Sequence, residues 1–200
     1  MGASDDKTLA FYDRSAADFV DQSVWPFDLE MLADTARLLP ESGHVLDLGC
    51  GSAWAAKAFA DRGFKVTATD GSPGIAEQAR QRTGLPVTVL RFDELVAVDT
   101  YDLIWASCSL HHVPQSALPD LIQRITDALR PGGWFAMSVK CGEGEARDNL
   151  DRFYAYYEKS DLTRLFAANG KLTAPEFRSR PGIGFSGTPS VCVWALAQHQ

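Results

Sequence analysis

Short apolar runs alternate with helical segments through the middle of this chain, and this alternation restricts the possible folds more than any other feature. Buried strands are indicated by HVLDLGC (44–50), FKVTATD (64–70), LPVTVLRFD (85–93), YDLIWASCS (101–109) and WFAMSVK (134–140). The intervening segments predict helices: one ends at Gly63, one opens at Ser72-Pro73, and one places apolar residues on a single face from Leu118 to Leu129. This order predicts right-handed crossovers, and therefore a doubly wound α/β fold with a mostly parallel sheet.

The flanking regions depart from this alternation. Residues 8–40 are rich in aromatic side chains and look helical, and residues 145–170 look like one or two helices. Segments 171–178 and 189–197 are predicted strands, and the short Gly/Pro-rich connection between them favours antiparallel pairing at a sheet edge. Two hundred residues suit one domain. We expect a single domain with a helical cap (1–40), a central core (44–140), and a lid segment followed by a C-terminal hairpin (141–200).

The charge balance bears on possible partners. The chain has 19 Lys and Arg against 26 Asp and Glu, a formal net charge of −7, and no cluster of basic residues. Binding to nucleic-acid phosphates needs a cationic face, so nucleic acid is disfavoured as a partner, and Arg178 and Arg180 are the best material for a small local patch.

The cysteines and the apolar runs indicate the cellular compartment in which we expect the protein. The four cysteines form no CxxC pair, which argues against a metal site and a disulfide framework and favours reduced thiols: Cys50, Cys108, Cys141 and Cys192. The N-terminus has neither the basic nor the apolar region of a secretion signal, and no apolar run approaches the roughly 20 residues of a membrane span. We expect a cytoplasmic protein without membrane contact, either a monomer or a homodimer.

Polar residues and glycines gather where the predicted strands end. In an open α/β sheet, ligands bind outside the carboxyl ends of the strands. The residues delivered to that edge are Asp47, Gly49, Cys50 and Gly51 after the first strand, Asp70, Gly71 and Ser72 after the second, Phe92 and Asp93 after the third, and Ser107, His111 and His112 after the fourth.

This set of residues indicates a nucleoside ligand. Gly49 and Gly51 allow a tight turn and close approach of the backbone, and Asp70, 19 residues beyond Gly51, can accept hydrogen bonds from both ribose hydroxyls. A nicotinamide dinucleotide fits equally well to this point. However, Trp54 stands where a dinucleotide fingerprint has its third glycine, and the Asp47 carboxylate would repel a pyrophosphate. A ligand with an ammonium and a sulfonium, S-adenosylmethionine, fits better.

The order and spacing of VLDLGCGSA, ATDGSPGIAEQA, RFDEL, YDLIWASCSLHHV and LRPGGWF resemble the class I methyltransferases over residues 44–140. Within that superfamily the chain resembles small bacterial methyltransferases of the tellurite-resistance and SmtA-like groups, and FYDRSAADF extends the likeness toward the N-terminus. The resemblance implies a seven-stranded Rossmann-like methyltransferase fold whose residues 44–140 bind the cofactor. The chain departs from the family at Ala53, where glycine is more common, and at Trp54 and Ala55, which replace a polar pair.

The resemblance also implies roles for individual residues. Asp47, Gly49, Cys50 and Gly51 would hold the methionine end of S-adenosylmethionine, Asp70 the ribose with Gly71, Ser72 and Ile75 beside it, and Phe92 and Asp93 the adenine; Ala106 and Ser107 would line the floor, and Tyr12 would close over the methyl donor. Trp25, Arg152 and Tyr154 are candidate substrate contacts, and Arg152 matches an arginine of related chains.

Several residues keep two interpretations. Of the adjacent His111 and His112 we expect only one to face the site; His112, whose His-Val step recurs in the family, is the candidate general base or a substrate contact. The aromatic run from Phe153 to Tyr157 is either core or a lid, and Arg152 either lies on a solvated helix face or binds a substrate carboxylate.

The leading functional hypothesis is methyl transfer to O, N, S or a metalloid of a small molecule, since no basic stripe or large recognition domain is evident. The alternatives are methylation of tRNA or protein, an intramolecular reaction of the donor, a non-catalytic cofactor-binding module, and a nicotinamide oxidoreductase.

Overall fold

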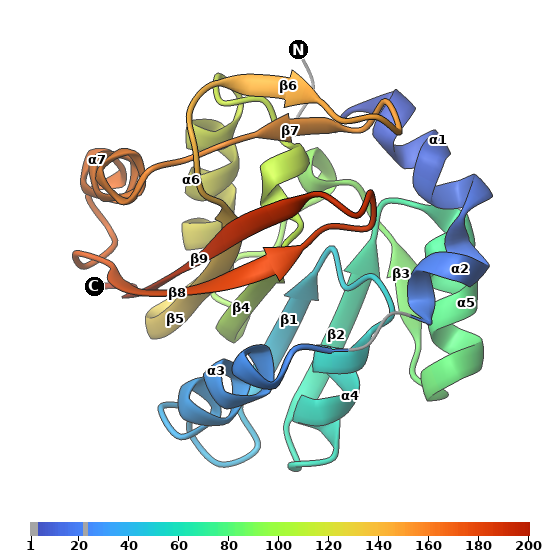
Figure 1. Ribbon diagram of the computed structural model, residues 1–200. Coiled ribbons are helices and arrows are strands. Elements are labelled where there is room, and N and C mark those ends of the chain that lie inside the picture. The colour runs from blue at the N-terminus through green and yellow to red at the C-terminus, as the bar shows by residue number, and fades with distance from the viewer. Residues whose placement is uncertain (1–3, 22–23) are drawn as a thin grey trace.

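The computed structural model describes residues 4–21 and 24–200. A seven-stranded sheet with the order β3-β2-β1-β4-β5-β9-β8 lies at its centre (Figure 1). The strands of this sheet are β1 (His44–Leu48), β2 (Lys65–Asp70), β3 (Val87–Val89), β4 (Tyr101–Ser107), β5 (Leu129–Lys140), β8 (Glu176–Ile183) and β9 (Pro189–Gln198). The pairs among β1 to β5 are parallel, and β9 runs antiparallel to both β5 and β8. The predicted doubly wound, mostly parallel sheet with an antiparallel C-terminal hairpin is confirmed.

Helices cover both faces of the sheet. The helices are α1 (Asp6–Arg14), α2 (Ala16–Val20), α3 (Pro26–Ala36), α4 (Trp54–Ala60), α5 (Pro73–Thr83), α6 (Leu118–Ala128) and α7 (Lys159–Asn169), with 3₁₀ turns at Phe92–Glu94 and Leu110–His112. Along β1, Leu46 and Leu48 pack in the cluster that contains α6 and α7, whereas Val45 packs with α3 and α4. All five residues of β1 are buried, as expected of a strand covered on both sides.

Local sequence signals fix the helix that follows β2. The Ser72 hydroxyl accepts the backbone N–H of Ile75, Pro73 occupies the first turn, and Gly84 ends α5 in a left-handed conformation. The predicted apolar face of residues 118–129 forms α6, whose leucines and isoleucines are buried against the sheet.

The segment from 145 to 158 differs from the expectation. Its residues were expected to be helical, but they form a two-stranded hairpin of β6 (Glu145–Arg147) and β7 (Phe153–Ala155), and only α7 is a helix. The cause is local: the Asp148 carboxylate accepts the backbone N–H groups of Leu150 and Arg152, each at 3.0 Å, which favours a turn over a helix. Asp151 adopts a positive φ of 59° in that turn.

The observed boundaries of two other strands differ from the predicted ones by a few residues. The strand expected over 85–93 is only three residues long, because the chain turns into the 3₁₀ helix at Phe92. The strand expected over 171–178 begins later, at Glu176, and pairs with β9 as far as Ile183.

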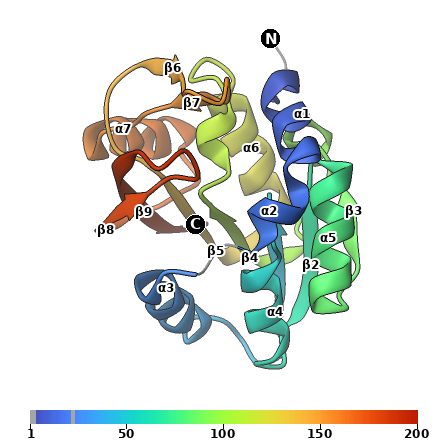
Figure 2. The same cartoon turned by 45° about the vertical axis from the view of Figure 1, so that its right-hand side comes forward.

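Two segments lie over the carboxyl ends of the parallel strands. In both views α1 and α2 lie beside α5, and the β6–β7 hairpin crosses above the sheet (Figures 1 and 2). Ala16 and Val20 of α2 pack on Ile75, and the Asp13 carboxylate accepts hydrogen bonds from the Ser72 hydroxyl and the Gly74 N–H. Between these segments and the strand ends lies the cavity described next.

Candidate functional site

A cavity of about 240 Å³ opens at the carboxyl edge of the sheet. Of the residues predicted for the site, those that line it are Tyr12, Trp25, Gly49, Cys50, Gly51, Asp70, Gly71, Ile75, Phe92, Ser107, His111, His112, Arg152 and Tyr154. Four others, Asp47, Ser72, Asp93 and Ala106, do not line it; all of them except the partly exposed Asp93 are buried.

The turn after β1 depends on glycine. Gly49 has a φ of 73°, and a Cβ there would lie 2.5 Å from the Cβ of Ser109. The backbone N–H groups of Gly49 and Cys50 both donate to the carbonyl of Thr69, which holds the turn against the end of β2. Ala53 also has a positive φ of 56°, a conformation that favours glycine.

Asp70 presents its carboxylate to the cavity at the end of β2. Its two oxygens each accept one backbone N–H, from Gly51 at 3.0 Å and from Ser72 at 2.9 Å. Burial and the nearby Asp13 carboxylate raise its pKa to about 6. Each oxygen keeps a lone pair for a ligand, so Asp70 is placed to accept two adjacent hydroxyl groups.

Two further carboxylates lie outside the lining of the cavity, and Asp47 forms no ion pair with any residue that the structure describes. Asp47 is 2% exposed and accepts the Ala56 N–H at 3.0 Å, and burial together with Asp70 raises its pKa to about 7. One carboxylate oxygen of Asp93 is buried without a hydrogen-bond partner in the described part of the chain, and Arg91 Nε is 3.9 Å away. The buried Asp47 carboxyl and the buried oxygen of the partly exposed Asp93 fit a ligand that brings a positive charge and N–H donors.

Ser72 and Ala106, the other two predicted residues that do not line the cavity, support the fold around it. Ser72 caps α5 and bonds to Asp13, and Ala106 is fully buried inside β4. Neither side chain is placed to touch a ligand.

The two histidines both line the cavity, so the expectation that only one would face it is wrong. They are the last two residues of the 3₁₀ turn Leu110–His112. His112 Nδ1 lies 2.6 Å from the Phe153 carbonyl and must donate to it, so Nε2 accepts the Tyr12 hydroxyl proton at 2.9 Å. Arg152 in turn donates to the Tyr12 oxygen at 3.1 Å.

This chain of hydrogen bonds bears on proton transfer. Burial lowers the pKa of His112 to about 4, and the His111 pKa also falls well below its usual value, chiefly through burial. Both rings are therefore neutral near pH 7, and the His112 lone pair is already engaged by Tyr12. In this geometry His112 positions Tyr12.

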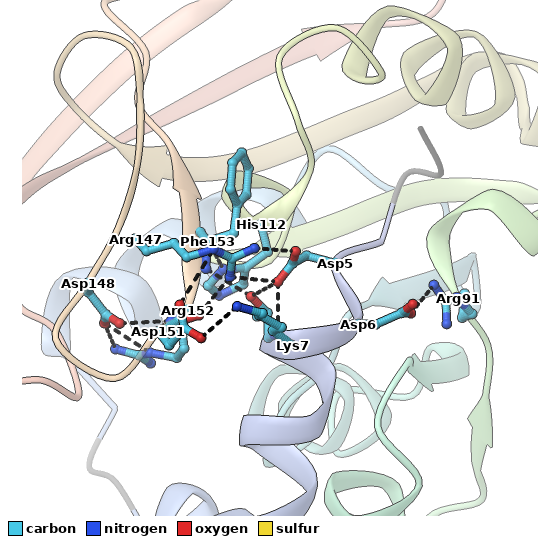
Figure 3. Close-up of polar contacts among 11 residues, drawn as sticks. Asp5, Asp6, Lys7, Arg91, His112, Arg147, Asp148, Asp151, Arg152 and Phe153 are labelled. Atoms are coloured by element: carbon cyan, nitrogen blue, oxygen red, sulfur yellow. Dashed lines mark hydrogen bonds and ion pairs between the residues drawn. The ribbon is translucent and has the colours of Figure 1, made fainter.

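Ion pairs connect α1 to the hairpin above the cavity (Figure 3). Asp5 pairs with Arg147 at 2.7 Å and Lys7 with Asp151 at 3.2 Å. The Phe153 N–H also donates to the Thr8 hydroxyl at 2.9 Å. The N-terminal helix and the β6–β7 hairpin thus form one continuous cover.

Arg152 has a different place from the solvated helix face that was one of its interpretations. It is 1% exposed, lies in the turn before β7, and donates two side-chain hydrogen bonds to the Asp148 carboxylate. Its charge is compensated within the protein.

The far end of the cavity contains residues that the sequence did not single out as site residues. Arg180, expected as material for a surface patch, is buried in a bidentate pair with Asp28, which also accepts the Trp194 indole N–H at 3.0 Å. Lys140, at the end of β5, lines the same region. No sequence signal marked these residues, because their partners are distant along the chain.

Two cysteines also meet at this end. Cys108 Sγ and Cys192 Sγ lie 4.0 Å apart, although 84 positions separate them in the sequence. Within residues 4–21 and 24–200, no group of three or more His, Cys, Asp or Glu side chains could hold a metal ion. Over the same residues, no helix is both long and apolar enough to cross a membrane.

Comparisons with known proteins agree with this geometry. Residues 45–133 match a family model described as a methyltransferase domain. A trans-aconitate 2-methyltransferase of Variovorax paradoxus is 36% identical over 126 residues, 58% of this chain and 46% of that protein. A ubiquinone biosynthesis O-methyltransferase of Xanthomonas axonopodis is 32% identical over 121 residues, 57% of this chain and 49% of that protein. The chain spans about half the length of these curated relatives.

Solved structures share the fold over nearly the whole chain. The 1,6-didemethyltoxoflavin N1-methyltransferase of Burkholderia thailandensis superposes with a TM-score of 0.71 at 22% identity, covering 97% of this chain and 88% of that one. The N-methyltransferase NodS of Bradyrhizobium japonicum gives 0.65 at 18% identity, covering 98% and 99%.

The fold is therefore that of the Rossmann-like, class I methyltransferases. Residues 45–133, which run from within β1 to the start of β5, match the model of a methyltransferase domain.

Proposed function

We propose that this chain is an S-adenosylmethionine-dependent methyltransferase that acts on a small molecule. The observation that carries the proposal is the carboxyl edge of the sheet, where the Gly49–Gly51 turn and the Asp70 carboxylate face one cavity inside the matched methyltransferase domain. The relatives that methylate trans-aconitate and ubiquinone precursors by name, and the toxoflavin enzyme, support a small acceptor.

The residues fit the cofactor on three counts. The glycine turn leaves no room for a Cβ, so the backbone itself forms the wall beside the ligand. Asp70 would accept the ribose hydroxyls, and the unpartnered oxygen of Asp93 would accept the adenine amino group. Asp47 would favour the ammonium of the methionine end from behind the turn.

When bound, S-adenosylmethionine supplies a methyl group on a positively charged sulfur. The protein's part is to hold donor and acceptor in line and to exclude water. Tyr12 and Tyr154 stand on the two covering segments, and the Asp5–Arg147 pair keeps those segments together. We infer that residues 1–40 and 141–200 close over the cofactor-binding core at 44–140.

His112 and His111 are proposed as residues that shape the acceptor end. Since His112 already accepts the Tyr12 proton, we assign it the positioning of Tyr12, and the His111 ring is left to contact the acceptor. Trp25 lies next to Arg180 at the far end of the cavity. The finer likeness to SmtA-like methyltransferases, a cytoplasmic location, and a monomeric or homodimeric state without nucleic-acid partners stay predictions.

The test is a calorimetric titration with S-adenosylhomocysteine, with NADH as the control ligand. We expect micromolar binding of the first ligand only, a loss of at least tenfold in Asp70→Ala, and no change in Asp120→Ala, which removes an exposed carboxylate on α6. Binding of NADH, or of neither ligand, would overturn the proposal.

The acceptor class needs a separate measurement. The protein is incubated with radiolabelled S-adenosylmethionine and either a small-molecule extract, tRNA or protein. Label in the small-molecule fraction supports the proposal, whereas label in tRNA or protein alone contradicts it. Formation of methylthioadenosine would instead reveal an intramolecular reaction of the donor, and binding without any turnover would indicate a non-catalytic module.

A further inference from the structure

Lys140 is a buried cation without a counterion. It is the last residue of β5, it is 8% exposed, and it lines the cavity. Its Nζ forms neither a hydrogen bond nor an ion pair with any residue in the ranges 4–21 and 24–200. The Tyr154 ring lies beside it, 3.7 Å from Nζ to the ring centroid, and Gly184 borders it so closely that a Cβ there would lie 3.1 Å from Nζ.

This arrangement is unusual, because lysines are almost never fully buried unless they are paired. The two other cations of this region are compensated: Arg152 pairs with Asp148, and Arg180 pairs with Asp28. The aromatic face of Tyr154 stabilises the ammonium only in part. One positive charge therefore remains at this end of the cavity.

The opposite end carries the opposite charge. Asp70 lines the cavity at the end of β2 and Asp47 lies behind the turn after β1, and neither forms an ion pair with a residue in the described ranges. Lys140 stands on β5, two strands away from β1 in the sheet, which corresponds to about 10 Å at the usual strand spacing. The cavity is thus polarised, with its negative end at the proposed cofactor site and its positive end at Lys140.

We propose that the methyl acceptor is a small carboxylic acid whose carboxylate binds Lys140 and supplies the missing counterion. This inference rests on the proposed function, since it assigns the acceptor end by its distance from the cofactor residues. A carboxylate matches the single uncompensated charge, whereas a phosphate dianion would bring a second negative charge that nothing balances. The acceptor atom then lies at the other end of the molecule, toward Ser107 and Gly49.

The test measures binding in two stages with the wild type, Lys140→Met, and Lys65→Met as a matched control. Lys65 is an exposed lysine on β2, at the end away from the cavity. In the first stage all three proteins are titrated with S-adenosylhomocysteine, and we expect equal affinities. If the wild type does not bind it, the proposed function fails, and this inference fails with it.

In the second stage the proteins, saturated with S-adenosylhomocysteine, are titrated with trans-aconitate, succinate, benzoate, the neutral methyl esters of these acids, and inorganic phosphate. We expect at least one acid to bind the wild type and Lys65→Met, and to bind Lys140→Met at least about 30-fold more weakly, as for loss of a charged hydrogen bond. The esters should not distinguish the three proteins.

Three results would overturn the inference while leaving the proposed function intact. They are no binding of any acid to the wild type, binding that Lys140→Met does not weaken, and Lys140-dependent binding of phosphate alone.

Discussion

Replacement of Asp47 by asparagine should raise the unfolding free energy of the ligand-free protein above that of the wild type. This gain should be larger at alkaline pH than at acidic pH. The Asp47 carboxyl is buried, and its pKa is raised to about 7 from the ordinary 3.8. The folded form therefore holds the proton more tightly than the unfolded form, so the wild type loses unfolding free energy as the pH rises from about 4 to about 7. At about 1.4 kcal/mol per pH unit, this interval corresponds to about 4 kcal/mol, an upper bound.

The assay is urea unfolding of the wild type and Asp47→Asn at pH 5, 6, 7 and 8. Asparagine keeps an oxygen for the Ala56 N–H but carries no titrating proton, so a change in packing shifts all four values equally. The stability difference in favour of the variant should grow by about 3 kcal/mol between pH 5 and pH 8. Asp70, which titrates near pH 6, is present in both proteins, so only its interaction with Asp47 contributes to the difference.

A difference that does not change with pH would refute the reasoning, because it would show that Asp47 is ionised at no cost. A second result links stability to binding. Saturation with S-adenosylhomocysteine, which carries an ammonium, should reduce the difference in unfolding free energy between Asp47→Asn and the wild type at pH 8. Asp120→Asn, an exposed control, should follow the wild type at every pH.

Three further predictions concern stability, each measured by chemical denaturation at pH 7. Asp28→Ala leaves Arg180 buried without its partner and should cost about 3–5 kcal/mol, and an effect below about 1 kcal/mol would show that water reaches the guanidinium. Gly49→Ala places a Cβ 2.5 Å from that of Ser109 at a φ of 73°, so we expect a loss of more than about 2 kcal/mol and no S-adenosylhomocysteine binding; unaltered binding would contradict the need for glycine. Tyr12→Phe removes the hydroxyl that bonds to buried partners on two other segments and should lower the unfolding free energy by about 1–3 kcal/mol. An unchanged unfolding free energy would indicate that a water molecule takes the place of the hydroxyl.

The sequence predicted which residues meet at the carboxyl edge of the sheet, because each of these signals is local. Gly49 and Asp70 follow directly on apolar strands, and parallel strands bring their carboxyl ends to one edge whatever the rest of the chain does. The same reasoning placed the capping residue Ser72 at the start of α5.

Residues 145–158 show where local signals failed. Their composition suggested a helix, but the Asp148 side chain satisfies backbone N–H groups in a turn, and the two short strands then pair with each other. The turn also buries Arg152, which the sequence left between a solvated face and a substrate contact.

The far end of the cavity was decided by the tertiary structure alone. Arg180 meets Asp28 across 152 positions, and Cys108 meets Cys192 across 84. Among the residues that the structure describes, Lys140 Nζ forms no hydrogen bond or ion pair, a property that exists only once every neighbouring segment is in place. The sequence therefore determined which residues gather at the carboxyl edge of the sheet, because strand ends carry that information. The residues around the far end of the cavity were settled by contacts between distant segments, which no local pattern encodes.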